Sequence, residues 1–186
     1  MPEKVNPAKL PEYSQHGEKT NDDLWLLPFD GDRKPIPYLQ GPASEILGSF
    51  SPNGRWMAYV SDESGPQQVY VETIPPSGDR WQVSTAGGSQ PRWRRDGREL
   101  FYVASDQKLM AVPVKSGWAA SGPFEVGAPQ PLFRGMLRGG GVAPRLFLYQ
   151  PTADGKRFMM PARSGGEAAT RQPITVVTNW QSALKK

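Results

Sequence analysis

The stretch SPNGRWMAYV, from Ser51 to Val60, returns as RRDGRELFYV from Arg94 to Val103 and as TADGKRFMMP from Thr152 to Pro161. Each copy is a polar turn closed by glycine, followed by a basic residue and an apolar run. In such a turn Asn or Asp bonds to the backbone and glycine accepts a positive φ angle, so the chain reverses tightly. The phrase therefore predicts a corner between two strands, with these turn residues: Asn53, Gly54, Asp96, Gly97, Asp154 and Gly155.

The spacing of the corners predicts how the strands are organised. Gly97 follows Gly54 by 43 residues and Gly155 follows Gly97 by 58, so the last unit is lengthened. A period in the low forties with strand-like segments is the signature of propeller blades, each a four-stranded antiparallel sheet. Helical solenoids of similar period need apolar residues at a spacing of about 3.6, which the sequence does not show.

Strand signals within each unit support this interpretation. RWMAYVS and QQVYVETI combine aromatic and β-branched residues around the hairpin signal DESGPQ, and RELFYVA and KLMAVPV repeat the pattern in the next unit, ahead of PFEVGAPQPLF. We predict an all-β fold, a partial β-propeller of about three four-stranded antiparallel blades that forms the C-terminal portion of a larger propeller. Residues 1–22 are expected to form a polar N-terminal arm or the remnant of a preceding blade. Residues 23–186 are expected to form the partial propeller, as an incomplete blade (23–45), two blades (46–86 and 87–133) and a last blade (146–181).

Composition agrees with a turn-rich β protein and excludes several chemistries. The 20 Gly and 20 Pro residues in 186 are too many for a helix-rich chain. Without cysteine there is no disulfide, thiolate nucleophile or Cys-based zinc site. The net charge of +4 is mild and spread along the chain, which is weak evidence for nucleic acid. The N-terminal segment lacks the apolar core of a signal peptide, and no run approaches the ~20 apolar residues of a membrane helix, so we expect no membrane insertion by this chain.

The repeated phrase resembles the WD-like β-propeller repeat of the periplasmic propeller protein of the Tol system, which is also found in tricorn-type and prolyl-oligopeptidase-type propellers. Three runs are more closely similar to the C-terminal propeller of bacterial membrane-anchored serine/threonine kinases: SPNGRWMAYVSDESG, VSTAGGSQPRWRRDGRELFYVASDQKLMAV and PITVVTNWQSALKK. The resemblance covers roughly residues 23–186. The chain departs from the repeat at Arg94 and Arg95, where Ser-Pro is usual, and at Thr152 and Ala153. The resemblance implies a protein or peptide partner and an extracytoplasmic, periplasmic location as part of a membrane-anchored parent.

The sequence offers no catalytic set. A serine-hydrolase triad and a zinc site both need histidine, and the single histidine, His16, lies in a polar segment. The glycine-rich loop, strand lysine, H-R-D and D-F-G motifs of a protein kinase are missing, so any kinase activity of a parent protein would lie outside this chain. Asp62, Asp96 and Asp154 are carboxylates in turns, where Asp is favoured for backbone bonding alone. We therefore expect no catalytic residue, no metal site and no cofactor.

One polar cluster, PRWRRDGR, is a candidate for ligand contact. Arg92 and Arg94 are two residues apart, so on an innermost strand they point to one face and could contact an anion or carboxylate in the central channel. The alternative explanation is that these arginines are ordinary surface charges that keep the protein soluble, beside a packed Trp93. A nucleic-acid surface is less expected, because the rest of the chain shows no matching basic and aromatic stripe.

The sequence thus indicates a non-catalytic β-propeller module for binding, scaffolding or sensing, which contacts a protein or a ligand. The alternative is the regulatory propeller fragment of an enzyme, foremost a bacterial serine/threonine kinase, with catalysis outside this chain. About three blades would leave a sheet face open at each end, which missing upstream blades or another chain could cover.

Overall fold

The computed structural model describes residues 12–16, 21–28, 33–115, 123–134, 146–161 and 175–177. All regular secondary structure in these ranges is β-strand, arranged in four antiparallel sheets. The predicted all-β fold and partial propeller are therefore confirmed. The predicted boundaries of the arm and the blades remain a prediction.

In each sheet the spatial order of the strands is their order in the chain, which is the meander of a propeller blade. The first sheet contains β1 (Glu12–His16), β2 (Asp22–Leu26) and β3 (Ile36–Leu39). The second contains β4 (Glu45–Phe50), β5 (Trp56–Ser61), β6 (Gln68–Thr73) and β7 (Arg80–Gln82). The third contains β8 (Gly88–Trp93), β9 (Glu99–Ala104), β10 (Lys108–Pro113) and β11 (Gln130–Arg134). The fourth contains β12 (Gln150–Pro151), β13 (Phe158–Met160) and β14 (Thr175–Val177).

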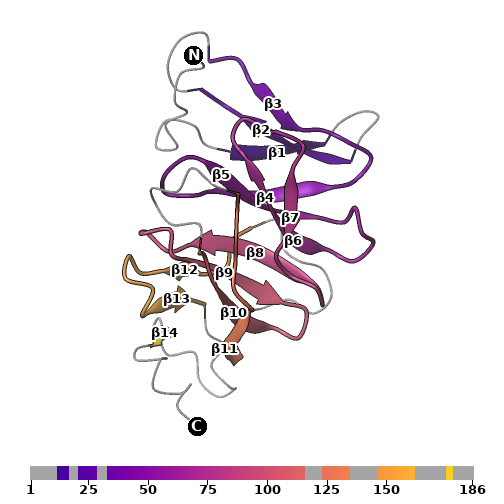
Figure 1. Ribbon diagram of the computed structural model, residues 1–186. Helices are drawn as coiled ribbons and strands as arrows, with labels where there is room; N and C mark the ends of the chain where they lie inside the picture. The colour runs from indigo at the N-terminus through magenta and orange to yellow at the C-terminus, as the bar shows by residue number, and fades with distance from the viewer. Residues whose placement is uncertain are drawn as a thin grey trace, which may run out of the picture.

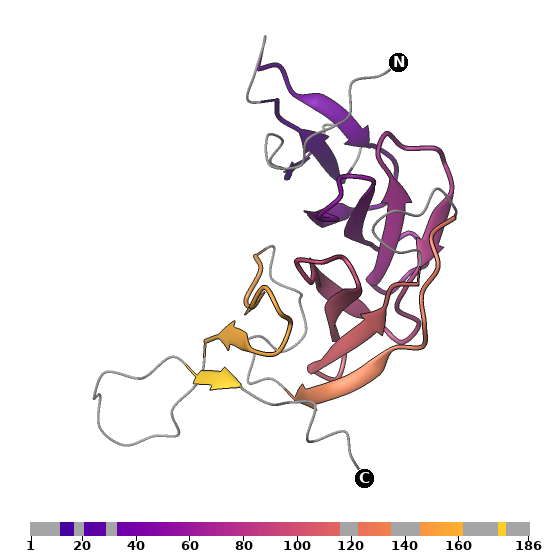
Figure 2. The same cartoon turned by 60° about the vertical axis from the view of Figure 1, so that its left-hand side comes forward.

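The four sheets follow one another in space as they do in the chain (Figure 1). Turned by 60°, the same view shows them along a curved path, from the indigo first sheet to the orange fourth (Figure 2). Each sheet lays a face against the next, and three apolar layers fill the spaces between neighbours. This is the radial stacking that the spacing of the corners predicted.

β5 shows why the central strands read as continuous apolar runs. Met57 and Tyr59 pack against Leu24 and Tyr38 of the first sheet. Side chains alternate between the two faces of a strand, so Trp56, Ala58 and Val60 point the other way, into the layer shared with the third sheet. A strand buried on both faces needs apolar residues at every position, and WMAYV supplies them.

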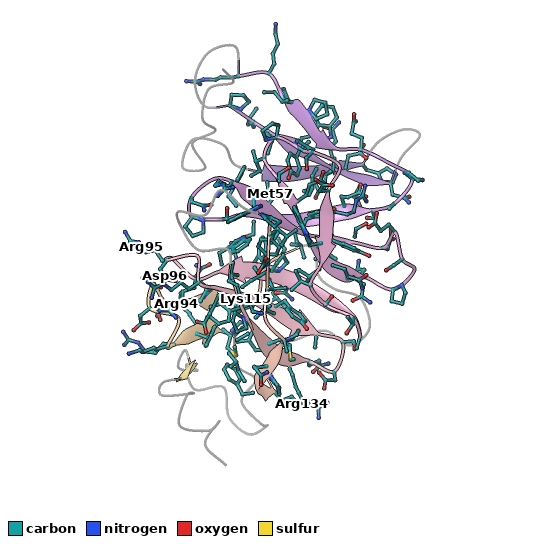
Figure 3. The ribbon with its side chains drawn as sticks, in the orientation of Figure 1. Met57, Arg94, Arg95, Asp96, Lys115 and Arg134 are labelled. Atoms are coloured by element: carbon teal, nitrogen blue, oxygen red, sulfur yellow. The ribbon has the colours of Figure 1, made fainter. Side chains whose placement is uncertain are left out.

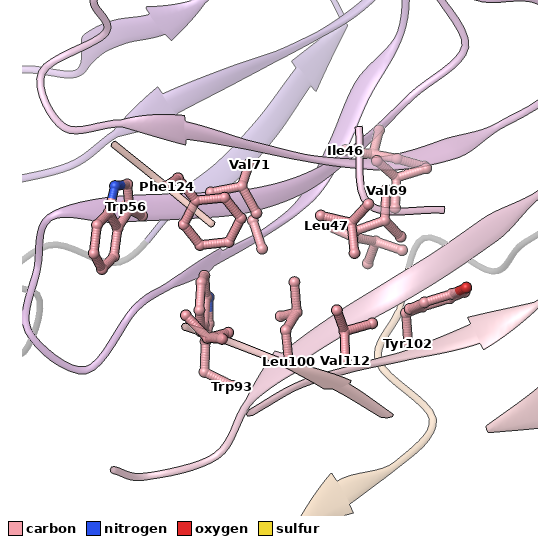
Figure 4. Packing of buried hydrophobic residues seen from close by; sticks show 14 residues of the cluster. Ile46, Leu47, Trp56, Val69, Val71, Trp93, Leu100, Tyr102, Val112 and Phe124 are labelled. Atoms are coloured by element: carbon pink, nitrogen blue, oxygen red, sulfur yellow. The ribbon is translucent and has the colours of Figure 1, made fainter. Parts of the chain in front are cut away.

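The layer between the second and third sheets contains an aromatic cluster. The ring centroid of Phe124 lies 5.4 Å from that of Trp56, 5.6 Å from that of Trp81 and 6.1 Å from that of Trp93. In Figure 4, Trp56, Phe124 and Val71 face Trp93, Leu100 and Val112 across this layer. The tilted and edge-on ring pairs are the favoured aromatic geometries.

Hydrogen bonds directly join β4 to β8, and β8 to the segment just before β12. The indole Nε1 of Trp93 on β8 donates to the carbonyl of Ser49 on β4 at 2.9 Å. The side-chain oxygen of Gln90 on β8 accepts from the amide of Leu148 at 2.7 Å, and the Tyr149 hydroxyl donates to the Gln90 carbonyl at 3.0 Å. These bonds hold the inner edges of neighbouring sheets together, where the sheets converge.

Candidate binding surface

The three corners share one backbone geometry. Gly54, Gly97 and Gly155 have φ angles of 69°, 70° and 67°, in the left-handed region that favours glycine. Each glycine amide donates to the carbonyl three residues earlier, at 2.8 to 2.9 Å. The Asn53 side-chain oxygen accepts from the amide two residues later at 3.2 Å; Asp96 and Asp154 do the same at 3.1 and 3.0 Å.

The first residue of each corner decides how the corner is braced. Ser51 accepts from the Trp56 amide through its hydroxyl at 2.9 Å, and Thr152 accepts in the same way from Arg157 at 3.1 Å. Arg94 holds this place in the middle corner and has no hydroxyl. Its guanidinium instead pairs with Glu99 at 2.9 Å and with Asp96 at 3.0 Å.

Arg94 also joins two neighbouring corners. A Cβ atom added to Gly155 would lie 3.0 Å from Cδ and 3.4 Å from Cγ of Arg94, so the arginine stem covers this glycine. The turn from Arg94 to Arg98 therefore lies against the turn from Thr152 to Arg157. Figure 3 shows Arg94, Arg95 and Asp96 at this end of the third sheet, with Arg95 directed away from the ribbon.

Four exposed cations gather on these two turns, and we name them the basic corner surface: Arg95, Arg98, Lys156 and Arg157. The Arg98 side chain is 77% exposed, and its closest carboxylate oxygen, on Asp96, is 3.9 Å away. Asp154 turns its carboxylate back into its own corner, where the Thr152 hydroxyl and the Lys156 amide lower its pKa. The carboxylates of the two turns are thus engaged locally, while the cations extend outward.

The two arginines predicted to contact an anion do point to one side, toward the fourth sheet. The guanidinium carbon of Arg92 lies 3.5 Å from the ring centroid of Phe147, a cation–π contact. Arg94 neutralises Asp96 and Glu99. An anion at either arginine would compete with these contacts, and the anion role of both residues remains a prediction.

The other polar residues considered from the sequence lie elsewhere. His16 Nδ1 is 3.7 Å from a carboxylate oxygen of Asp22, and the side chain is 69% exposed. Asp62 accepts from the backbone amide of Ser44 at 2.8 Å. In the ranges that the structure describes, no three His, Cys, Asp or Glu side chains lie close enough together to hold a metal ion.

A second polar cluster, which sequence reasoning missed, is buried between the first and second sheets. Burial and the carboxylate of Asp23 raise the pKa of Glu45 to about 7. Glu72 is buried as well; burial raises its pKa, and the amide of Gly78 donates to one of its oxygens at 3.1 Å. Arg80, which pairs with Glu63, is the cation of this cluster. An alternating strand pattern could have indicated Glu72 as inward-facing, but not the partners across the sheets.

Antiparallel sheets that stack radially and are tied at their inner edges define an open fragment of a β-propeller. Solved structures with the same fold include TolB from Acinetobacter baumannii, which matches 92% of this chain with a TM-score of 0.61 and 16% sequence identity. Putative TolB from Agrobacterium tumefaciens matches 82% with a TM-score of 0.58 and 17% identity. An oligogalacturonate lyase in complex with manganese matches 78% with a TM-score of 0.51 and 17% identity.

These likenesses show a Tol-type propeller fold. The chain spans 38% and 50% of the length of the two TolB structures, and 39% of the lyase. No protein-family model matches the sequence. Among the residues that the structure describes, no helix has the length and apolar character to cross a membrane.

Proposed function

We propose that the chain is a non-catalytic binding or scaffold module that uses its basic corner surface to bind an acidic segment of a protein or peptide. One observation carries this proposal. The contact between Arg94 and Gly155 brings two corners together, and each contributes two exposed cations, from Arg95 and Arg98 and from Lys156 and Arg157. Arginine in particular binds carboxylates in a planar, bidentate geometry.

The carboxylates on the same turns favour a peptide over a nucleic acid. Asp96 lies between Arg95 and Arg98, and Asp154 lies two residues before Lys156, so a uniform line of phosphates would meet carboxylates as well as cations on these turns. Binding to a single-stranded nucleic acid uses a continuous basic groove with aromatic platforms. A peptide with spaced Asp or Glu residues can place its carboxylates on the arginines and leave gaps opposite Asp96 and Asp154.

Charge reversal tests this role. In the double variant Arg95→Glu/Lys156→Glu, affinity for a fluorescent peptide of Glu residues spaced by Gly and Ser should fall by about tenfold or more, because each reversal replaces attraction by repulsion. Fluorescence anisotropy at two salt concentrations measures the affinity, and we expect weaker binding at the higher salt concentration.

The control is Lys34→Glu/Arg134→Glu. It changes the net charge equally at two exposed cations outside the two corners: Lys34 lies just ahead of β3 in the first sheet, and Arg134 ends β11 opposite Lys108. Equal losses in both double variants would show that only net charge matters and would contradict the proposal. Tighter binding of a single-stranded oligonucleotide of equal charge would favour the nucleic-acid alternative.

A second proposed role is the regulatory propeller of a bacterial serine/threonine kinase, located outside the cytoplasm. It is supported by the sequence resemblance of SPNGRWMAYVSDESG and PITVVTNWQSALKK to the propellers of such kinases. The coding sequence on the 5′ side of Met1 tests it. Kinase motifs and a membrane helix there would establish this role, and an unrelated reading frame would remove it.

A further inference from the structure

β1 occupies the position in the first sheet that β5 and β9 occupy in the second and third. Three pairs of facing residues show this equivalence: Tyr13 with Trp25, Tyr59 with Tyr70, and Tyr102 with Met110. The second residue of each pair lies on β2, β6 or β10. The residue just before it on that strand is Leu24, Val69 or Leu109, and it is buried in the apolar layer toward the following sheet. The three hairpins therefore have the same register and the same orientation.

In the second and third sheets this position is covered by an inner strand. β4 pairs with β5, and β8 pairs with β9. Both inner strands contain a bulge at the same place, where Leu47 and Gln90 adopt φ angles of 55° and 56°. Neither residue is glycine, so the strand pairing holds both in a backbone conformation that is costly for ordinary residues.

In the part of the chain that the structure describes, nothing covers the corresponding edge of β1. Among the residues that the structure describes, β2 is the only strand that pairs with β1. Ser14, Gln15 and His16 are exposed, whereas Val60 and Val103, which correspond to Ser14, are 0% and 6% exposed. An uncovered edge presents backbone donors and acceptors to any extended segment that reaches it.

We propose that this edge of β1 binds an extended segment of a partner polypeptide, which adds antiparallel as the inner strand of the first sheet. Main-chain hydrogen bonds would supply the affinity, as in other cases of strand addition. The segment that fits resembles β4, with apolar and small residues and a bulge that places one residue at positive φ. This inference goes beyond the proposed function, because it uses neither the basic corner surface nor its charges.

The convergence of the sheets favours a single strand over a second copy of the chain. β4, β8 and the segment before β12 already touch through the hydrogen bonds of Trp93, Gln90 and Tyr149. Pairing of β1 with β1 of another copy would extend the first sheet by three strands toward this crowded side. One added strand would occupy only the place that β4 and β8 take in their own sheets.

Hydrogen exchange with a synthetic copy of residues 44–54, SEILGSFSPNG, tests the proposal on the full chain. The peptide should slow exchange of the β1 amides that do not bond to β2 by about tenfold or more. The matched control is the same peptide with alternate backbone amides N-methylated, which keeps every side chain and removes the donors needed for pairing. The double variant Arg95→Glu/Lys156→Glu should respond to the peptide as the unaltered chain does.

Three results would overturn the proposal. Protection of the outer strands β3, β7 or β11 in place of β1 would show that the peptide adds to any open edge. Equal protection by the N-methylated peptide would show that side chains alone hold it. Slow exchange of the same β1 amides before any peptide is added would show that the chain, or a second copy detected by light scattering, already covers the edge.

Discussion

Glu45 has a buried carboxyl group next to apolar layers, and a charge on this group costs free energy in the folded state. Its side chain is 5% exposed at the boundary of the first and second sheets, and one carboxylate oxygen is 3.4 Å from the Ser61 hydroxyl. Its other oxygen has no hydrogen-bond partner among the described residues. Asp23, Glu63 and Arg80 also act on its charge, and two of these three are acidic. Ionisation at this site is therefore unfavourable in the folded state.

The free energy of unfolding should fall as pH rises from 4.5 to about 7, the ordinary pKa of Glu45 and its pKa in the folded chain. The carboxyl has a pKa of about 7 in the folded chain and an ordinary value of 4.5 when unfolded. Between these values the unfolded state has released the proton and the folded state still holds it, so raising the pH favours unfolding by on the order of 1 to 3 kcal/mol. Glu45→Gln removes this pH dependence. The free energy of unfolding of the variant, minus that of the unaltered chain, should therefore be larger at pH 8 than at pH 4.

Asp106 provides a control of opposite sign. The side chain and amide of Lys108 lower the pKa of Asp106, so its contribution is present above the ordinary pKa and is lost as pH falls. In urea titrations, Asp106→Asn should therefore lose stability relative to the unaltered chain as pH rises toward 3.8, and this difference should stay constant at higher pH, where Glu45→Gln gains stability. A constant difference between Glu45→Gln and the unaltered chain at every pH would refute the assignment.

At the scale of elements, the segment PFEVGAPQPLF packs differently from what its sequence suggests. It reads as one strand, yet β11 begins only at Gln130. Phe124 lies ahead of it, beside the single bridge between Val114 and Val126, and inserts its ring between the second and third sheets. A short crossing segment thus supplies the centre of the aromatic cluster.

Removing this ring should weaken the contact between two whole sheets. Phe124→Ala leaves a cavity bordered by Trp56, Trp81 and Trp93, and should cost about 3 to 5 kcal/mol of unfolding free energy. Met159→Ala, at a side chain that is 51% exposed on β13, should cost far less. Urea denaturation measures both variants, and similar losses would show that Phe124 does not hold the sheets together.

The sequence predicted those parts of the fold that depend on local chemistry. The apolar strand segments and the Gly- and Pro-containing turns between them follow from strand and turn preferences of individual residues. The contact of Arg94 with Gly155 joins residues from different sheets, and no local pattern records it. The left-handed conformations of Leu47 and Gln90 escape prediction for a related reason, because sheet pairing imposes them against the residues' own preference.

For the whole molecule, the order of stability should follow the number of covered faces. The second sheet has an apolar layer on each side, against the first and the third, and the third sheet is covered by the second and the fourth. In the residues that the structure describes, the first and fourth sheets each have one such layer. Units that contact only their neighbours unfold as a series, so the ends open first.

Native-state hydrogen exchange of the full chain should therefore show three levels of protection. Amides in β5 and β9 should exchange most slowly, since their sheets open only after a neighbour has separated. Those in β2 should be intermediate, because Leu24, Leu26 and Tyr38 are buried against the second sheet. Amides in β13 should exchange fastest, because the fourth sheet pairs only short strands of two or three residues. Uniform protection of all four sheets would mean that the chain unfolds in one cooperative step, and that an open propeller can be as cooperative as a closed one.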